Sequence, residues 1–345
     1  MTCGVPGGGP SGTPKQHAAM SDLRVHIASR FSDAHLTRIR EVSGRIHLSY
    51  DPHSPYQRPG GSDAHLEDVE VLLSHHAYFE LASAPRLRWL QLPGDGVDHL
   101  RDAPVMKGDV IVTNARVFAT PITEYVFASI IAYYRYFPQM MERFQKGRVW
   151  PRSQWEEYAG DELAGKTMAI IGYGAIGRKL ARVARSFDLT VVGTRRSVAS
   201  VVREDGVDVH PAGDLGSLLS LADIVVVCLP LTRETERLIG ETELRAMKPG
   251  AYLVTVGRGK VIEESALLRA LREGWIGGAG LDVHAQTPLP ADSPFFDLPN
   301  VILTPHMSGV SQGYYQRITD LFCENLRRYI AGEPLMNLVD KQKGY

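Results

Sequence analysis

The segment TMAIIGYGAIGRKLARVARSF, residues 167–187, decides the fold of this chain. Residues Thr167–Ile171 read as a buried strand, and helical spacing of apolar residues begins at Ala175. Between them, residues 172–177 have the glycine spacing GxGxxG. A strand, a glycine loop and a helix in direct succession predict the first unit of a parallel α/β fold with a phosphate-binding loop. The alternative is a glycine-rich turn without a ligand.

Each glycine of this loop has a physical role. Gly172 permits a tight turn, Gly174 lets the backbone approach a pyrophosphate, and Gly177 lets the helix pack on the strand. Ala175 and Ile176 begin the helix, whose N-terminal N–H groups and partial positive charge attract phosphate. The loop therefore predicts a bound dinucleotide.

The end of the next strand, Thr190–Gly193, indicates which dinucleotide is bound. An NAD site usually has Asp or Glu about 20 residues after the loop, where it binds the ribose 2′-hydroxyl. Here Thr194, Arg195 and Arg196 occupy that region. Two guanidinium groups could bind a 2′-phosphate. We therefore expect NADP(H) to be preferred, with NAD(H) possible; the alternative is that both arginines are simply solvated.

Composition restricts the class of protein. The chain has 345 residues and a formal charge of −1 (38 Lys+Arg, 39 Asp+Glu), which predicts two globular domains and argues against nucleic-acid binding. No apolar run approaches the roughly 18 residues of a membrane span. Three cysteines do not form a disulfide framework or a metal motif, so we expect a cytoplasmic protein without a metal. Residues 1–20 are rich in Gly and Pro and are predicted to be a disordered tail.

Short apolar runs alternate with helical patterns along the rest of the chain, which predicts parallel β/α units. A closing helix is expected at 317–330. The expected strands of the first half are Leu23–Ile27, Val69–Leu73, Leu87–Leu92 and Val110–Thr113. Those of the second half form a series of six: 167–171, 190–193, 224–229, 251–256, 278–282 and 301–303.

A long helix is predicted to begin at Thr120-Pro121, with Thr120 as N-cap and Pro121 at the first helical position. Nearly every residue from Tyr125 to Phe137 is apolar or aromatic. A helix that is apolar almost all round is buried on most sides. We therefore expect a homodimer that forms through the helix at 120–146.

Three polar residues each follow a predicted strand, where an open α/β sheet places its ligands. They are Arg258, Asp282 and His306. A guanidinium can bind a carboxylate through two hydrogen bonds, and a histidine can transfer the proton of a carbonyl while hydride moves. Asp282 can orient a nicotinamide amide. Each residue also has a purely structural interpretation. Arg258 could cap a helix or form a surface ion pair, and Asp282 could be an N-cap. His306 could be one of the twelve histidines without a functional role.

Six motifs between about residues 69 and 340 resemble those of the D-isomer-specific 2-hydroxyacid dehydrogenase family. They are Gly94–Asp98, Gly172–Gly177, Cys228–Thr232 with Thr235, Gly257–Ile262, Leu281–Val283 and Asn300–His306. The resemblance implies an α/β fold with two Rossmann-like, doubly wound parallel-sheet domains separated by a cleft. Residues 21–118, completed by 306–345, would be the flavodoxin-like substrate domain, and residues 119–305 the dinucleotide-binding Rossmann domain.

The resemblance also implies an NAD(P)-dependent reduction of a 2-keto acid to a D-2-hydroxy acid, NADPH being preferred. Arg258 would bind the substrate carboxylate and carbonyl, and His306 would be the acid/base. The backbone of Gly94, Asp95, Gly96 and Val97 would hold the carboxylate from the opposite side. The cofactor would contact Leu229, Pro230, Thr235, Val256, Gly257, Asp282, Ser308 and Gly309, in addition to Arg258 and His306.

The sequence departs from the family pattern at Thr287, where the family has a glutamate that pairs with the catalytic histidine. A neighbouring anion favours the charged form of an imidazole. Without that glutamate, we expect the protein to remain active but to favour keto-acid reduction at acidic pH. Gln286 or Thr287 could still orient the ring. Asp95 is a second departure, because a negative side chain beside a carboxylate site is unfavourable unless it points away. The alternative function is a dinucleotide-sensing binding protein with weak or no catalysis.

Overall fold

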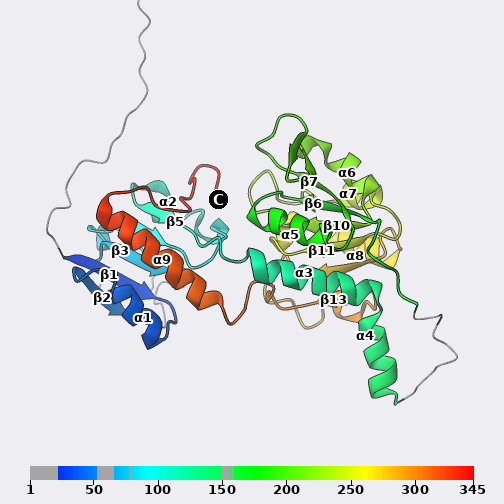
Figure 1. Ribbon diagram of the computed structural model, residues 1–345, viewed down its shortest axis with the longest axis horizontal. Helices are drawn as coiled ribbons and strands as arrows, with labels where there is room; N and C mark the ends of the chain where they lie inside the picture. Colours follow the sequence, from blue (N-terminus) through cyan, green and yellow to red (C-terminus); the bar gives the residue numbers. More distant parts are fainter. Residues whose placement is uncertain (1–21, 53–65, 78, 149–155, 157–158) are drawn as a thin grey trace, which may run out of the picture. The chain divides into compact units, whose positions relative to one another are not determined.

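The computed structural model describes residues 22–52, 66–77, 79–148, 156 and 159–345 (Figure 1). The predicted tail at 1–20 lies outside these residues. Two compact units are present. The smaller unit comprises the described residues of 22–94, Leu100–Ala115 and Tyr315–Lys341, and the larger comprises Asp95–His99, the described residues of 116–314 and Gln342–Tyr345. In contrast to the expected boundaries, residues 306–314 and the short 95–99 segment belong to the larger unit.

The smaller unit is a parallel sheet with the strand order β2-β1-β3-β4-β5, a doubly wound order of the flavodoxin type. Its strands are β1 (Leu23–Ala28), β2 (Ile46–Tyr50), β3 (Val71–Ser74), β4 (Trp89–Gln91) and β5 (Ile111–Thr113). Its helices are α1 (Asp33–Arg40), α2 (Pro104–Lys107) and α9 (Tyr314–Ala331), with the short turn η2 (Leu81–Ser83). The turn η3 (Asp98–Leu100) begins in the segment that belongs to the larger unit and ends at Leu100 of the smaller unit.

Helix α9 completes the core of the smaller unit although it lies far from the sheet in sequence. The fully buried Trp89 on β4 stacks on Tyr329 of α9, with ring centroids 5.5 Å apart, and contacts Phe322. The indole N–H of Trp89 donates to Thr113 Oγ1 at 2.7 Å. Burial of aromatic rings of this size contributes a large part of the hydrophobic free energy of a small domain. The C-terminal helix therefore belongs structurally with the N-terminal sheet.

The larger unit is built on an eight-stranded sheet in the order β13-β12-β11-β10-β6-β7-β9-β8. Only β8 runs antiparallel to its neighbour. The strands are β6 (Thr167–Ile171), β7 (Thr190–Thr194), β8 (Val202–Glu204), β9 (Val207–His210), β10 (Ile224–Val227), β11 (Tyr252–Thr255), β12 (Gly278–Leu281) and β13 (Val301–Leu303). The helices and turns are α3 (Ala119–Tyr134), α4 (Phe137–Met140), the π-helical η4 (Met141–Lys146), α5 (Ala175–Arg185), η6 (Ala212–Asp214), α6 (Leu215–Leu221), α7 (Glu241–Ala246), η7 (Gly259–Val261), α8 (Glu264–Arg272) and η8 (Pro294–Asp297).

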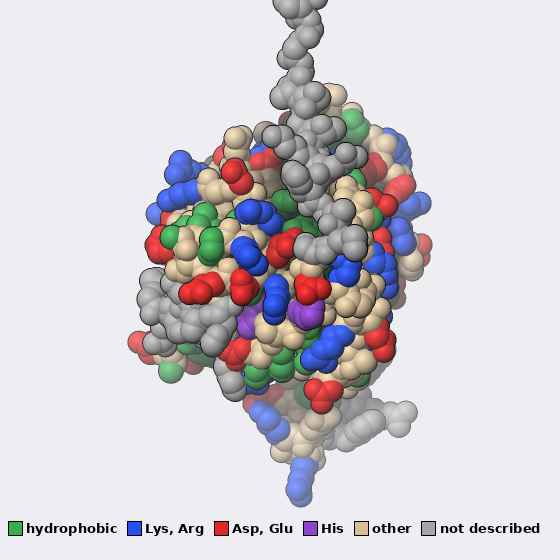
Figure 2. All heavy atoms as spheres, turned by 90° about the vertical axis from the view of Figure 1, so that its left-hand side faces the viewer, with side chains coloured by type: hydrophobic (Ala, Val, Ile, Leu, Met, Phe, Trp, Pro, Cys, Tyr) green, Lys and Arg blue, Asp and Glu red, His purple; other side chains and the backbone are tan. Residues whose placement is uncertain are grey.

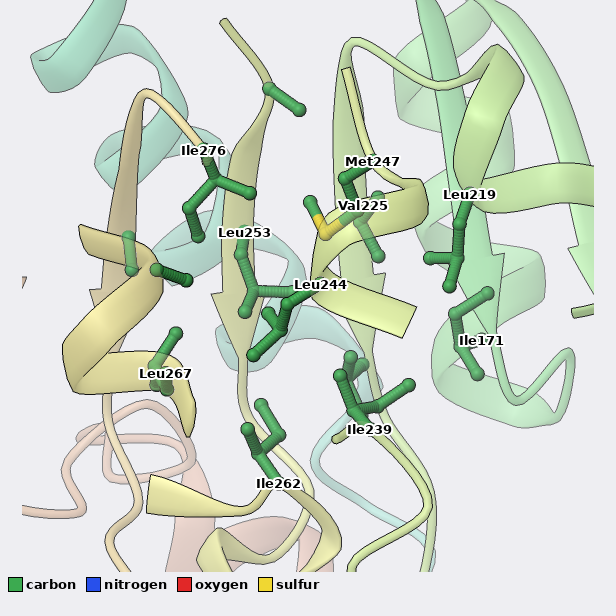
Figure 3. Packing of buried hydrophobic residues seen from close by; sticks show 14 of the residues in the cluster. Ile171, Leu219, Val225, Ile239, Leu244, Met247, Leu253, Ile262, Leu267 and Ile276 are labelled. Carbon is green, nitrogen blue, oxygen red and sulfur yellow. The ribbon is translucent and has the colours of Figure 1, made fainter. Parts of the chain in front are cut away.

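Two hydrophobic layers cover the faces of this sheet. Side chains of α3 and α5 pack on one face, and those of α6, α7 and α8 pack on the other. Figure 3 shows the second layer, in which Leu244 of α7 and Leu267 of α8 lie against Leu253 of β11. The central strand β10 is buried at every position, as expected for a parallel strand covered on both faces. This arrangement brings the carboxyl ends of β6 and β10–β13 to one edge.

All six strands predicted for the second half of the chain are present, but the prediction missed the hairpin of β8 and β9. Its turn has Asp205 at φ 49° and Gly206 at φ 79°. Positive φ at both positions is the requirement of a type I′ turn, for which Asp-Gly is a preferred sequence. The Asp-Gly pair could therefore have predicted the hairpin turn. The edge strand Val202–Glu204 was harder to predict, because it is short and charged and lacks an alternating apolar pattern. The strand β2 was missed too.

The predicted start of the long helix was wrong by about one residue, because α3 begins at Ala119 with Phe118 as N-cap. Thr120 therefore lies inside the first turn. Eight residues of α3, among them Val126 and Ile130, are buried. Packing within the larger unit therefore accounts for most of the apolar character of this helix. The exposed apolar side chains follow it, at Tyr136, Phe137 and Met141.

The surface carries both signs of charge. On the face that Figure 2 shows, Lys and Arg side chains are interspersed with Asp and Glu side chains. Among the described residues, no helix combines the length and the apolar character that a bilayer crossing requires.

The side chain of Asp223, directly before β10, binds the first residue of β6 and Lys248 before β11, and we predict that Asp223→Asn destabilises the larger unit. The carboxylate accepts hydrogen bonds from Thr167 N and Lys248 Nζ, both at 2.8 Å. Burial opposes the charge, but these hydrogen bonds outweigh it and lower the pKa of Asp223. The loss should be about 1–3 kcal/mol at neutral pH. A lowered folded-state pKa means that the stabilisation is present above the unfolded value of about 3.9 and disappears as the pH falls through the folded value.

Urea unfolding at neutral pH and below pH 4 checks this prediction. The wild type and Asp223→Asn should differ at neutral pH and converge in acid. Asp208→Asn, which removes an exposed ion pair with Arg203, is the control and should change stability by at most about 0.5 kcal/mol. A pH-independent difference would contradict the role of the charge.

Candidate functional site

The glycine loop follows β6 and opens α5, as predicted. Gly172 has φ 106°, and a Cβ atom there would lie 3.0 Å from the carbonyl oxygen of Cys228. A Cβ atom on Gly177 would lie 2.9 Å from the carbonyl oxygen of Gly172. Both positions therefore require glycine for backbone geometry and packing. Gly174, the N-cap of α5, has open space where its Cβ would be. The loop is thus closely packed at Gly172 and Gly177 and open at Gly174.

Three residues at the end of β7 border this loop. Thr194 Oγ1 accepts a hydrogen bond from Gly172 N at 3.3 Å. Arg195 Nη1 donates to Glu204 Oε2 at 2.7 Å, and its buried Nε has no hydrogen-bond partner among the described residues. Arg196 is paired with Glu234, and its guanidinium lies over the ring of Tyr345, 4.9 Å from the centroid. Both arginines are therefore ion-paired, which their local sequence did not reveal.

The segment after β10 lies beside the loop. Thr235 Oγ1 donates to the carbonyl oxygen of Pro230 at 2.6 Å and accepts from the backbone of Thr232 at 2.8 Å. A Cβ atom on Gly257 would overlap the backbone of Leu229. Val256 is buried directly after β11. The structure thus brings Gly257 against Leu229, at the start of the segment 229–235.

These features fit a dinucleotide. Helix α5 has 11 residues, and the first N–H groups of such a helix attract phosphate. A Cβ atom on its N-cap, Gly174, would meet no protein atom within 4 Å. The unpartnered Nε of Arg195 supplies a buried donor at the end of the adjacent strand. A phosphate would satisfy such donors, since buried N–H groups are rarely left without a hydrogen bond.

Arg258 follows β11 and is held by acidic and backbone groups. Its Nε donates to Asp98 Oδ1 at 2.8 Å, and its Nη1 donates to the carbonyl oxygen of Gly257 at 2.9 Å. A Cβ atom on Gly96 would overlap Arg258 Nη2, so only glycine fits there. These bonds use two of the five N–H groups of a guanidinium. The remaining N–H groups can bind a carboxylate.

Asp95 and Val97 flank Gly96 in the same segment. Burial raises the pKa of Asp95, while Arg116 and Arg258 act to lower it. A raised pKa favours the neutral carboxyl group, which reduces the repulsion that we expected between Asp95 and a bound carboxylate. Val97 is 2% exposed. Gly94 belongs to the smaller unit, where its carbonyl oxygen accepts a hydrogen bond from Ala115 N at 2.9 Å.

Asp282 fixes the loop that carries His306. The Asp282 side chain is fully buried and accepts hydrogen bonds from Thr304 Oγ1 at 2.5 Å, Met307 N at 2.8 Å and Ser308 N at 2.9 Å. His306 itself is exposed and has a left-handed φ of 59°. A non-glycine residue adopts this conformation only when its surroundings impose it. Asp282 therefore positions His306, a role in addition to the nicotinamide contact that we predicted.

The remaining expected site residues lie in the loops after β12 and β13. Ser308 is buried, and a Cβ atom on Gly309 would lie 2.8 Å from the ring of Phe118. Thr287 is exposed. Sequence reasoning missed Tyr125, which contacts the site through a hydrogen bond of 2.7 Å between its hydroxyl and Thr304 Oγ1. Burial raises the pKa of Tyr125 to about 12. No motif signalled this residue, which precedes Thr304 by 179 positions.

The fold and the site define an oxidoreductase that uses a nicotinamide dinucleotide. The sequence profile described as "D-isomer specific 2-hydroxyacid dehydrogenase, NAD binding domain" matches residues 127–308. The chain belongs to the D-isomer specific 2-hydroxyacid dehydrogenase family.

Curated relatives support this assignment. The glyoxylate reductase of Pyrococcus furiosus is 36% identical over 293 residues, which cover 80% of this chain and 84% of the relative. The glyoxylate reductase of Aeropyrum pernix is 35% identical over 299 residues, which cover 85% of this chain and 88% of the relative.

Solved structures agree with the fold. A D-isomer specific 2-hydroxyacid dehydrogenase family protein from Aeromonas salmonicida matches 93% of this chain and 100% of its own, with a TM-score of 0.81 and 32% identity. A D-isomer specific 2-hydroxyacid dehydrogenase from Xanthobacter autotrophicus, in complex with NADPH and MES, matches 94% of this chain and 100% of its own, with a TM-score of 0.78 and 28% identity.

We predict that Gly174→Ala and Gly177→Ala have different effects. The new methyl group at position 174 meets no protein atom, so thermal stability should change little, but it projects toward the phosphate position. Loss of one charge-assisted N–H···phosphate bond should raise the Kd for NADPH by about 10-fold or more. Gly177→Ala instead crowds the backbone of Gly172 and should lower Tm. Fluorescence titration and thermal unfolding of both variants test this; equal affinity in Gly174→Ala and wild type would refute it.

Proposed function

We propose that this protein reduces a small 2-keto acid to the D-2-hydroxy acid with NADPH as the preferred hydride donor. The observation that carries the proposal is the fixed guanidinium of Arg258, anchored by Asp98 and Gly257 at the end of β11. A small anionic substrate suits this group because three of its N–H bonds remain for a carboxylate and the adjoining carbonyl.

The reaction needs a hydride, which the reduced nicotinamide supplies when bound. Arg258 binds the substrate carboxylate and draws electron density from the keto oxygen. His306 donates a proton to that oxygen as it becomes a hydroxyl group. Asp282 holds the His306 loop through the backbone N–H groups of Met307 and Ser308. Each group is thus fixed before the substrate arrives, which is the condition for efficient proton and charge transfer.

The substrate class receives support from relatives. Curated relatives are named glyoxylate reductases, and a structural neighbour at 25% identity from Sinorhizobium meliloti is an NADPH-dependent glyoxylate/hydroxypyruvate reductase in complex with NADP and sulfate. Glyoxylate is the smallest 2-keto acid and contains only the groups that Arg258 and His306 recognise. We therefore choose glyoxylate as the first substrate to test.

The preference for NADPH is supported by Arg195 and Arg196 at the end of β7. Glu204 and Glu234 pair with them in the structure, so a 2′-phosphate must compete with two carboxylates. The phosphate carries more charge than one carboxylate and offers more acceptor oxygens, which favours it in this competition. The buried, unpartnered Nε of Arg195 also remains for it.

The proposal extends to assembly and location. A homodimer through residues 120–146 would cover Tyr136, Phe137 and Met141, which are exposed at 41%, 47% and 56%. Exposed aromatic and methionine side chains of this kind are enriched in subunit interfaces. We keep the cytoplasmic location expected from the few cysteines.

Arg258→Gln tests the reaction. We expect kcat/KM for glyoxylate to fall by about 100-fold or more, because two charge-assisted hydrogen bonds to the substrate are lost. NADPH oxidation in the spectrophotometer measures the rate, and fluorescence titration should show unchanged NADPH binding. Arg237→Gln removes a surface ion pair with Glu263 and is the matched control. A wild type that binds NADPH but reduces no 2-keto acid would instead favour a dinucleotide sensor.

Arg195→Gln and Arg196→Gln test the cofactor preference. The ratio of kcat/KM with NADPH to that with NADH should exceed 1 in the wild type and fall by about 10-fold in each variant. Arg203→Gln, which breaks an ion pair with Asp208 on the β8–β9 hairpin, should leave the ratio unchanged. A wild type that prefers NADH, or variants with an unaltered ratio, would show that these arginines do not bind the 2′-phosphate.

A further inference from the structure

The segment Gln342–Tyr345 is a part of the larger unit that the proposed reaction does not use. Tyr345 is half-buried, and its hydroxyl accepts a hydrogen bond from Nη2 of Arg196. The guanidinium of Arg196 also lies over the Tyr345 ring, 4.9 Å from the centroid. A tyrosine that is 149 residues away in the sequence thus binds one of the two arginines that follow β7.

Gly344 gives this segment the turn that leads into Tyr345. Its φ is 74°, which lies in the left-handed region that glycine adopts without strain. A Cβ atom at this position would meet no other atom within 4 Å, so the backbone conformation requires glycine and the packing does not. A substitution of Gly344 can therefore displace the Tyr345 ring without crowding a neighbour.

Arg196 is held on two sides and keeps N–H groups for a ligand. Its Nη1 binds Glu234 and its Nη2 binds Tyr345, so three of the five N–H bonds of the guanidinium remain. The adjacent Arg195 has a buried Nε without a hydrogen-bond partner among the described residues. Buried donors of this kind are rarely left unsatisfied, which indicates a ligand with several acceptor oxygens. The end of this strand is where a Rossmann fold binds the ribose of its cofactor.

The two partners of Arg196 differ in what they offer to such a ligand. A carboxylate only accepts hydrogen bonds, so Glu234 competes with a phosphate. A tyrosine hydroxyl accepts one hydrogen bond and donates another. Because the Tyr345 hydroxyl accepts from Arg196, its own O–H bond is available, and it has no acceptor among the described residues. An O–H bond that is held on a guanidinium group is a further donor for a phosphate oxygen.

We propose that Tyr345 is a residue of the 2′-phosphate site for NADPH. Its ring holds the guanidinium of Arg196, and its hydroxyl accepts from Arg196 while it donates to a phosphate oxygen. NADH lacks this phosphate, so the contact favours NADPH alone. The inference rests on the proposed preference for NADPH, to which it adds a specificity-determining residue far from β7 in the sequence.

Two adenosine fragments that differ only in the 2′-phosphate test the inference. Isothermal titration calorimetry gives the Kd values of AMP and of adenosine 2′,5′-bisphosphate. Tyr345→Phe removes the O–H donor and keeps the ring, so the bisphosphate should bind about 10-fold more weakly while AMP binding is unchanged. Tyr345→Ala also removes the ring beside Arg196, which should weaken bisphosphate binding by about threefold more.

Two further variants separate a donor from a competitor. Glu234→Gln removes a competing charge, so it should tighten bisphosphate binding, which is the opposite of the effect of Tyr345→Phe. Gly344→Ala strains the turn before Tyr345 and should weaken bisphosphate binding by about fivefold. Neither variant should change the Kd of AMP.

The matched controls lie in the smaller unit. Tyr315→Phe removes a hydroxyl from a tyrosine of α9 that is 37% exposed. Gly332→Ala alters another glycine with a left-handed φ, of 71°, and with no atom within 4 Å of a new Cβ. Both variants should leave the Kd values of the two fragments unchanged.

Three results with Tyr345→Phe would overturn the inference. An unchanged Kd of the bisphosphate would show that the hydroxyl does not bind the phosphate. Tighter binding would show that the hydroxyl competes with the phosphate as Glu234 does. An equal loss of affinity for both fragments would assign Tyr345 a structural role.

Failure of the proposed function is recognised separately. The ratio of the two Kd values in the wild type decides whether the 2′-phosphate is preferred, and turnover of glyoxylate decides whether a 2-keto acid is reduced. The change in that ratio on substitution of Tyr345 decides the role of this residue, because it needs neither turnover nor a particular wild-type ratio. A wild type that binds neither fragment would overturn the inference together with the proposed cofactor.

Discussion

The buried carboxylate of Asp282 is the group on which the proposed chemistry depends most. It is inaccessible to solvent and is satisfied by the hydroxyl of Thr304 and the backbone N–H groups of Met307 and Ser308. An unpaired buried charge is very costly, so these donors must stay in place. The loop from Thr304 to Ser308 is consequently held in place, with the exposed His306 in a left-handed backbone conformation. The buried carboxyl group that follows β12 thus fixes the loop that follows β13 and carries His306.

Arg258 is fixed in a comparable way. Asp98 accepts from its Nε, and Gly96 leaves room for its Nη2. Asp95 adds a second carboxyl group, but burial disfavours its charged form. Asp95 therefore offsets less of the positive charge of Arg258 than a fully ionised carboxylate would. Asp95 and Thr287 are the two positions at which this chain departs from the family pattern, and Thr287 is exposed.

Cofactor choice has a similar electrostatic basis. The two arginines after β7 suggested NADPH from the sequence, yet the structure places Glu204 and Glu234 on them. The proposed preference for NADPH therefore depends on how a phosphate competes with carboxylates, and not on the presence of arginine alone. Glu204 follows Arg195 by only nine residues, but it lies on β8, the edge strand of the hairpin that the sequence pattern did not predict, and this hairpin brings it to Arg195.

Local patterns identified the parallel strands, the phosphate loop and the polar residues after β11, β12 and β13. These features depend on strand periodicity, on glycine conformation and on the rule that ligands bind at the carboxyl ends of parallel strands, all of which act over a few residues. The partners of those residues were not predictable. Asp98 and Arg258 are 160 residues apart, and Tyr125 and Thr304 are 179 apart. Only the packing of the chain brings such groups within hydrogen-bond distance, and these contacts fix their orientation.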